Sequence, residues 1–171
     1  MNTLRRACVV ASIVWGLALP LATGLASPRA PESSAGYAFA LAIYAAGSLI
    51  CHQRAERSFH LFGVQMPVCA RCAGLYVGAA VAAAIVIARA IHTLARRPPE
   101  VSSRWSIPVP TLWTARTVVV ASCLPTIATL LYEWITGQMP ANTIRALAGV
   151  PLGAAAVGIM ASSDRVVREN K

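Results

Sequence analysis

The sequence is poor in charged residues, and this scarcity limits the class of protein that it can encode. Only 12% of its 171 residues are charged, whereas 57% are hydrophobic. The mean hydropathy is accordingly positive. A chain of this length has room for roughly four to six apolar helices that cross a bilayer, and for no soluble domain beside them. We therefore predict an integral membrane protein whose partner is the lipid bilayer.

The sequence also lacks a basic stripe interleaved with aromatic residues, which is the usual signature of nucleic-acid binding. Its net charge is +9, but the arginines stand at the ends of apolar segments. Arginines in such positions are explained by membrane flanks, so we expect no nucleic-acid partner. Internal repeats and low-complexity tracts are absent as well.

The apolar runs predict an all-helical, polytopic membrane protein with four or five transmembrane segments. The long runs are residues 7–26, 67–88, 117–136 and 143–161. A shorter run, 37–50, predicts either a short span or a re-entrant second segment. Residues 1–26 form a first span or a signal-like segment, and the proline- and arginine-rich stretch 89–116 predicts the largest loop. We expect a single integral membrane domain over residues 1–171.

Glycines recur at the spacing that lets helix backbones approach each other closely. Gly74 and Gly78 have this spacing in the run 67–88, and Gly149 and Gly153 have it in the run 143–161. Such faces predict a compact bundle, and they could also join copies of the chain into a homo-oligomer.

Alternation across the bilayer brings polar residues from three runs to one membrane surface, which we call the site side. The start of 67–88, the end of 117–136 and the start of 143–161 must share a side. This side receives Cys69, Cys72, Glu133, Asn142 and Arg145, and Cys51-His52 is tied to it by a short loop. Because ionisable groups at membrane depth are costly, we expect Glu133 and Arg145 to pair with each other or to face the cysteines and histidines.

The orientation of the site side depends on whether the second run crosses the membrane. With five spans, the site side holds six Lys and Arg residues and the opposite side nine, so the site would face away from the cytoplasm. Arg5-Arg6, however, favour a cytoplasmic N-terminus. A re-entrant second run removes this conflict, because four spans keep the N-terminus, the proline-rich loop and the C-terminal tail all cytoplasmic.

Three of the five cysteines lie in one short polar stretch, and their pattern favours a transition-metal site. Thiolate and imidazole ligands suit soft or borderline metals, with zinc as the first choice. Gln53 and Ser58 could orient the ligands, and Arg71 could offset excess thiolate charge. The candidate ligands are Cys51, Cys69 and Cys72, with His52 or His60 as the fourth.

Two other hypotheses remain open for the same residues. In the first, the protein performs thiol redox chemistry, because a helix N-terminus and Arg71 would both make Cys69 more nucleophilic. In the second, the cysteines are structural, and the chain is a partner-binding protein or a small transporter subunit. Arg57 with Ser58 could also bind an anionic headgroup or phosphate, or Arg57 could simply be solvated.

The motif pattern resembles an uncharacterised family of small prokaryotic predicted membrane proteins. The resemblance rests on Cys51-His52-Gln53, on Glu56-Arg57-Ser58-Phe59 and on Cys69-Ala70-Arg71-Cys72, and it covers about residues 49–153. Glu133, Asn142, Arg145, Gly149 and Gly153 continue it, although Glu133 stands where the family has Asp. The resemblance implies a helical protein of a prokaryotic cell membrane. It implies no established activity, so it leaves open whether the protein is an enzyme.

Overall fold

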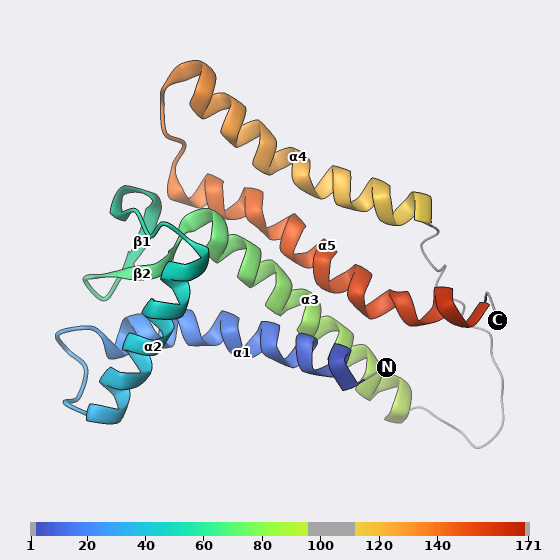
Figure 1. Cartoon of the computed structure of the whole chain (residues 1–171), viewed down its shortest axis with the longest axis horizontal. Coiled ribbons are helices and arrows are strands. Elements are labelled where there is room, and N and C mark those ends of the chain that lie inside the picture. Colours follow the sequence, from blue (N-terminus) through green and yellow to red (C-terminus); the bar gives the residue numbers. More distant parts are fainter. Residues whose placement is uncertain (1–2, 96–111, 170–171) are drawn as a thin grey trace.

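Long helices form most of the protein, and a small β-hairpin lies at one end of them (Figure 1). This computed structural model describes residues 3–95 and 112–169. The elements in chain order are α1 (Thr3–Leu25), α2 (Ser34–Ile50), the 3₁₀ turn η1 (Ala55–Arg57), β1 (Ser58–Leu61), β2 (Val64–Cys69), α3 (Ala70–Ala95), α4 (Leu112–Thr136) and α5 (Asn142–Glu169).

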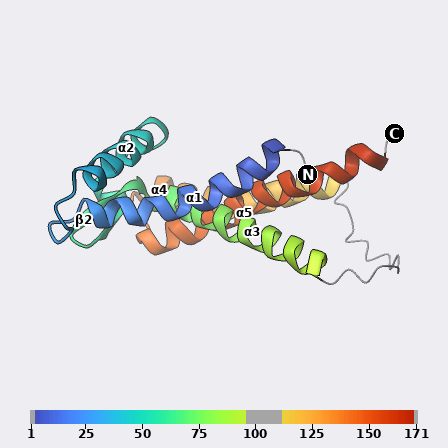
Figure 2. The same ribbon diagram turned by 90° about the horizontal axis from the view of Figure 1, so that it is seen from below.

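Four of the helices are long and apolar enough to cross a membrane, namely α1, α3, α4 and α5. The remaining helix, α2, has only 17 residues and lies beside one end of α1 instead of following the bundle axis (Figures 1 and 2). Large apolar side chains such as Leu17, Val81 and Leu131 are exposed along the spans, as lipid contact requires. The prediction of a polytopic helical membrane protein with a short second segment is therefore confirmed.

Helices α3 and α5 are packed backbone to backbone at the predicted glycines. A Cβ atom added at Gly74 would lie 1.8 Å from the carbonyl oxygen of Ala146, and one at Gly153 would lie 1.8 Å from that of Leu75. Gly78 and Gly149 are similarly tight. Only glycine permits this approach, so the predicted compact packing is confirmed within one chain. Assembly of several copies through these faces stays a prediction.

The hairpin β1–β2 is an element that the apolar runs do not predict. Its strands are antiparallel, with Ser58 opposite Cys69 and Leu61 opposite Val64. The two-residue turn has positive φ at both positions, 56° at Phe62 and 79° at Gly63, as type I′ turns require. Because residues 64–69 pair with β1, α3 begins at Ala70 and not at Pro67, as the sequence suggested.

Three helix ends also differ from the ends of the predicted apolar runs. Helix α3 continues to Ala95 and α4 begins at Leu112, so the connection is shorter than the predicted loop 89–116. Its central part, 96–111, lies outside the described residues. Helix α5 continues to Glu169, beyond the predicted end at 161. Hydropathy marks where a helix leaves the apolar layer, whereas hydrogen bonding lets the helix continue into polar surroundings.

The hairpin, the end of α4 and the start of α5 lie together, at the end of the bundle away from the start of α1 and the end of α5 (Figure 1). This is the arrangement that alternation predicts for the site side.

Candidate functional site

Three cysteine sulfurs meet at the site side. Cys51 directly follows α2, Cys69 ends β2, and Cys72 stands in the first turn of α3. Their sulfur atoms all lie within 4.8 Å of one another, and all three thiols are free. The backbone N–H of Cys69 donates a hydrogen bond of 3.2 Å to the Cys51 sulfur. The structure thus brings together the three cysteines that the sequence singled out.

Gln53 holds the segment that carries Cys51 against the strand that carries Cys69. Its backbone has a φ of 46°, which turns the chain sharply after the helix. Its side-chain amide donates to the carbonyl oxygens of Tyr44, at 3.0 Å, and Pro67, at 2.7 Å. Gly47 allows the close approach, since an added Cβ there would lie 2.4 Å from the Pro67 carbonyl oxygen. Gln53 therefore positions the cysteines, as a supporting residue would.

One side of the cysteine cluster is apolar. Cys51 is buried with Leu19, Val68 and Ala73, and Trp15 and Tyr76 pack against this group. These residues come from α1, β2 and α3, so three elements enclose the sulfurs on this side. Apolar packing of this kind limits the access of water to the cysteine sulfurs.

Cys69 is the thiol that the surroundings favour as a thiolate. A hydrogen bond from the Cys72 thiol lowers the pKa of Cys69 to about 5, against the opposing effect of burial. The backbone N–H groups of Cys72 and Arg71 and the Cys51 thiol lower this pKa further. Thiolates are both metal ligands and nucleophiles, so this shift is compatible with either chemistry.

The two candidate histidines lie in different places. His52 is exposed and lines a cavity together with Cys69, whereas His60 is exposed on β1 opposite Gln65. Within the described residues, the group of ligand atoms that lie within 4.8 Å of one another consists of the three cysteines. A histidine as fourth ligand stays a prediction for both residues.

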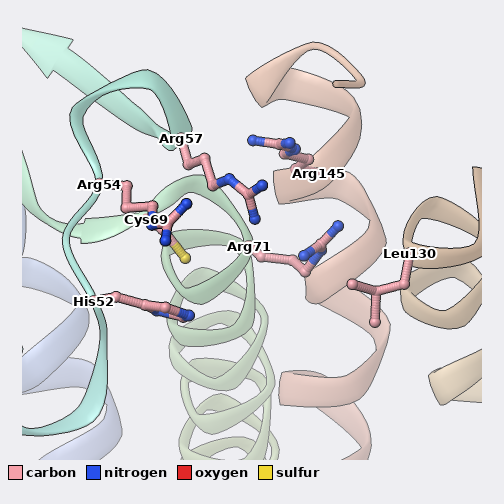
Figure 3. Close-up of a pocket in the computed structure, with 7 residues that line it drawn as sticks. All are labelled: His52, Arg54, Arg57, Cys69, Arg71, Leu130 and Arg145. Carbon is pink, nitrogen blue, oxygen red and sulfur yellow. The ribbon is translucent and has the colours of Figure 1, made fainter. Parts of the chain in front are cut away.

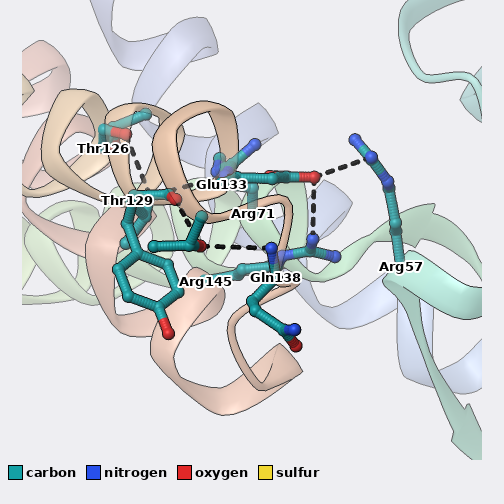
Figure 4. Close-up of polar contacts among 9 residues, drawn as sticks. Arg57, Arg71, Thr126, Thr129, Glu133, Gln138 and Arg145 are labelled. Carbon is teal, nitrogen blue, oxygen red and sulfur yellow. Dashed lines mark hydrogen bonds and ion pairs between the residues drawn. The ribbon is translucent and has the colours of Figure 1, made fainter.

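Glu133, near the end of α4, holds three arginines from three elements (Figure 4). Its carboxylate oxygens lie 2.7 Å from Nη2 of Arg57, 3.2 Å from that of Arg145 and 3.4 Å from that of Arg71. Arg145 is only 2% exposed. The expected pairing of Glu133 with Arg145 is confirmed, and the carboxylate also links η1, α3 and α5.

Ser58 and Asn142 attach the hairpin to the helices around it. The Ser58 hydroxyl donates to the carbonyl oxygen of Arg54 at 2.8 Å, and the Ser58 carbonyl accepts a 3.1 Å bond from the Asn142 side-chain amide. Ser58 is almost fully buried. The side chains of these two predicted supporting residues therefore donate to backbone carbonyl oxygens that hold the hairpin in position, and not to the cysteine sulfurs.

A cavity of about 250 Å³ lies beside Cys69 (Figure 3). Its walls combine residues from the loop after α2, from η1, β2, α3, α4 and α5: His52, Arg54, Arg57, Cys69, Arg71, Leu130 and Arg145. Sequence reasoning missed Arg54 as a site residue. The available signal was its spacing, because Arg54 and Arg57 stand on either side of the short turn that leads into β1.

Comparisons with known proteins identify a family and two relatives of this chain. The family described as "Predicted membrane protein (DUF2085)" matches residues 51–159. An uncharacterized protein of Methanocaldococcus jannaschii is 58% identical over 38 residues, which cover 22% of this chain and 24% of that protein. An uncharacterized protein of Methanothermobacter thermautotrophicus is 53% identical over 30 residues, which cover 18% of this chain and 27% of that protein. The matches span about a quarter of each relative's length. No solved structure matches the chain.

Proposed function

We propose that this chain, which belongs to the DUF2085 family of predicted membrane proteins, binds a transition metal, zinc in the first instance, through Cys51, Cys69 and Cys72. The observation that supports this proposal is the convergence of three free thiols from separate segments to within 4.8 Å of one another. The chain is an integral membrane protein, and this site would be its functional centre.

The spacing of the sulfurs suits a shared ion. Zinc–sulfur bonds of about 2.3 Å in a tetrahedron place sulfurs roughly 3.8 Å apart. The sulfurs of Cys51, Cys69 and Cys72 need to move by only about an ångström to reach that separation. Cys51 and Cys69 already approach each other through the backbone hydrogen bond at Cys69. Binding would therefore require a small adjustment of side chains and no rearrangement of the helices.

Three protein ligands leave one tetrahedral position for another group. His52 faces the same cavity as Cys69, so the fourth ligand would be His52 or a water molecule from that cavity. A structural site would be closed by His52, whereas an open position is the usual arrangement of catalytic zinc.

The positive charge around the cysteines also supports metal binding. Three thiolates and one divalent ion together carry a single negative charge, and Arg71 follows Cys69 within the motif. Other arginines line the cavity beside the sulfurs. This positive environment would offset the negative charge of a metal-bound cluster.

Thiol–disulfide exchange is the second candidate function, and the position of Cys69 at the start of α3 favours it. In this scheme the Cys69 thiolate attacks a disulfide of a substrate protein and releases one thiol. Cys72 then displaces the mixed disulfide, so that the chain holds a Cys69–Cys72 disulfide and the substrate holds two thiols.

Elemental analysis of the detergent-purified protein, combined with thiol counting, tests these proposals. We expect about one zinc or other transition-metal ion per wild-type chain, and its loss in the Cys69→Ser/Cys72→Ser variant. Cys8→Ser/Cys123→Ser is the matched control, since those cysteines lie in α1 and α4, outside the cluster. It should keep the metal.

The other outcomes of this assay decide against metal binding. Absence of metal, before and after zinc titration, together with two thiols that oxidise reversibly would favour exchange chemistry. Absence of metal with unreactive thiols would leave the cysteines a structural role. Equal metal content in the cluster variant and in the control would show that any bound metal sits elsewhere.

A further inference from the structure

We infer that the arginine-lined cavity beside Cys69 is a binding site for a phosphate group, either free phosphate or the phosphate of a lipid headgroup. This inference does not depend on metal binding, because it rests on the arginines. The cavity brings together Arg54, Arg57, Arg71 and Arg145, which come from the loop after α2, from η1, from α3 and from α5 (Figure 3).

The charges of the cavity are strongly unbalanced. Among the described residues, Glu133 is the carboxylate that pairs with these arginines, and it is shared by Arg57, Arg71 and Arg145. Four guanidinium groups thus face one carboxylate. Even a metal-bound cysteine cluster with one negative charge would leave two positive charges. Positive charge at membrane depth is costly, so a bound anion with two charges would stabilise the site.

Arg145 gives independent evidence for a ligand. Its side chain is 2% exposed, and it lines the cavity. Nη2 of Arg145 contacts Glu133, but its buried Nε has no hydrogen-bond partner among the described residues. The same holds for the buried Nε atoms of Arg57 and Arg71. Buried donors are nearly always satisfied in folded proteins, so three unsatisfied ones on arginines that line a single cavity indicate an absent acceptor.

The chemistry of these donors suits a phosphate group. Guanidinium groups present paired N–H donors that match the oxygens of phosphate, and the excess of arginines over carboxylates can balance the two negative charges of that anion. The cavity volume of about 250 Å³ exceeds that of one phosphate ion and lies just below the range for drug-sized ligands. It therefore has room for a small substituent such as the glycerol of a phospholipid.

The position of the cavity explains how either form of phosphate could enter. Leu130 of α4 forms one wall and is exposed, and a second cavity shares Leu130 and Arg57 with the first. The exposed Trp134 lines that second cavity. Tryptophan favours the headgroup level of a bilayer, so the opening lies where lipid phosphates are found and where water also reaches.

Phosphate titration of the full chain in a neutral detergent, at constant ionic strength, tests the inference. The readout is the thermal unfolding midpoint, and binding of phosphatidylglycerol or diacylglycerol is counted in parallel by native mass spectrometry. The test variant is Arg54→Gln, because Arg54 is not one of the arginines that pair with Glu133 within the part of the chain that the structure describes, so its loss leaves those three ion pairs intact. Arg29→Gln is the matched control, since Arg29 is an exposed arginine on the same membrane side, before α2.

We expect saturable stabilisation by phosphate that is weakened about tenfold or more in Arg54→Gln and changed less than about twofold in Arg29→Gln. A second pattern would show that the phosphate belongs to a lipid. In that pattern free phosphate has no effect, phosphatidylglycerol binds in a 1:1 ratio and diacylglycerol does not bind. Arg54→Gln would then abolish the binding of phosphatidylglycerol. Absence of both kinds of binding, or equal losses in the two variants, would overturn the inference.

Discussion

Removal of the Glu133 carboxylate by Glu133→Gln should destabilise the protein more than any other single change of an acidic residue. Arg145 is 2% exposed and the Glu133 side chain 11% exposed, so their 3.2 Å contact is a buried ion pair. Loss of one partner of such a pair costs about 3–5 kcal/mol, because the other charge stays buried. The contact with Arg57, whose side chain is 33% exposed, should add less than about 1 kcal/mol.

Unfolding in mixed detergent micelles, followed by helical circular dichroism, measures this loss. Glu56→Gln is the matched control, because Glu56 is exposed in η1, next to Arg57. Its free energy of unfolding should change by less than about 0.5 kcal/mol. The double variant Glu133→Gln/Arg145→Gln removes both buried charges and should be more stable than the sum of the single effects predicts, by about 2–3 kcal/mol.

Two results would refute this reasoning. If Glu133→Gln behaved like Glu56→Gln, Arg145 would not depend on the carboxylate, and the site would be open to water. If the effects of Glu133→Gln and Arg145→Gln were additive, the two side chains would not form a coupled pair in the membrane-bound protein.

Four further outcomes are expected. Gly153→Ala should destabilise the bundle by about 1–3 kcal/mol, because the added Cβ would meet a backbone carbonyl at 1.8 Å. Gly158→Ala is the control, since an added Cβ there has nothing within 4 Å, and it should not destabilise the bundle. Thermal unfolding of the two variants measures the difference. A reporter fused after Met66 should be active outside the cytoplasm, and cytoplasmic activity would contradict the proposed orientation. Glu133→Gln should tighten phosphate binding in the same titration, since it removes the carboxylate that competes for the arginines, and weaker binding would contradict this role. Cys51→Ser alone should lower the metal content below one ion per chain, and an unchanged content would exclude Cys51 as a ligand.

Much of the fold follows from the sequence because lipid imposes a simple requirement on it. A span must be long, apolar and helical, so hydropathy finds α1, α3, α4 and α5. Outside the apolar layer this requirement disappears. The hairpin has strands of four and six residues, with Phe62 as a bulky residue at a turn position of positive φ. Such a short pairing leaves no pattern that hydropathy can detect.

Most of the residues of the site were predictable from topology, whereas their arrangement was not. Alternation of three spans places Glu133 and Arg145 on one side, and the cost of isolated charge in lipid then pairs them. The direction of a loop side chain depends on local backbone angles instead. The cavity contains Arg54 because Gln53 adopts a positive φ and turns the chain between Cys51 and β1. No periodicity in the sequence specifies that turn.

The four-span topology connects the orientation of the protein to the chemistry of its thiols. Of the 15 Lys and Arg residues, ten stand in the first turns of α1, around the α3–α4 connection or in the last turns of α5 and the tail after it, and five belong to the site side. By the positive-inside rule the cysteines would then face away from the cytoplasm, where free thiols are prone to oxidation. One disulfide would use two of the three sulfurs and leave a reactive third, whereas one metal ion satisfies all three. An outward-facing cluster of three cysteines therefore favours metal binding over a static disulfide. A cytoplasmic site, in which the thiols stay reduced without help, would remove this support.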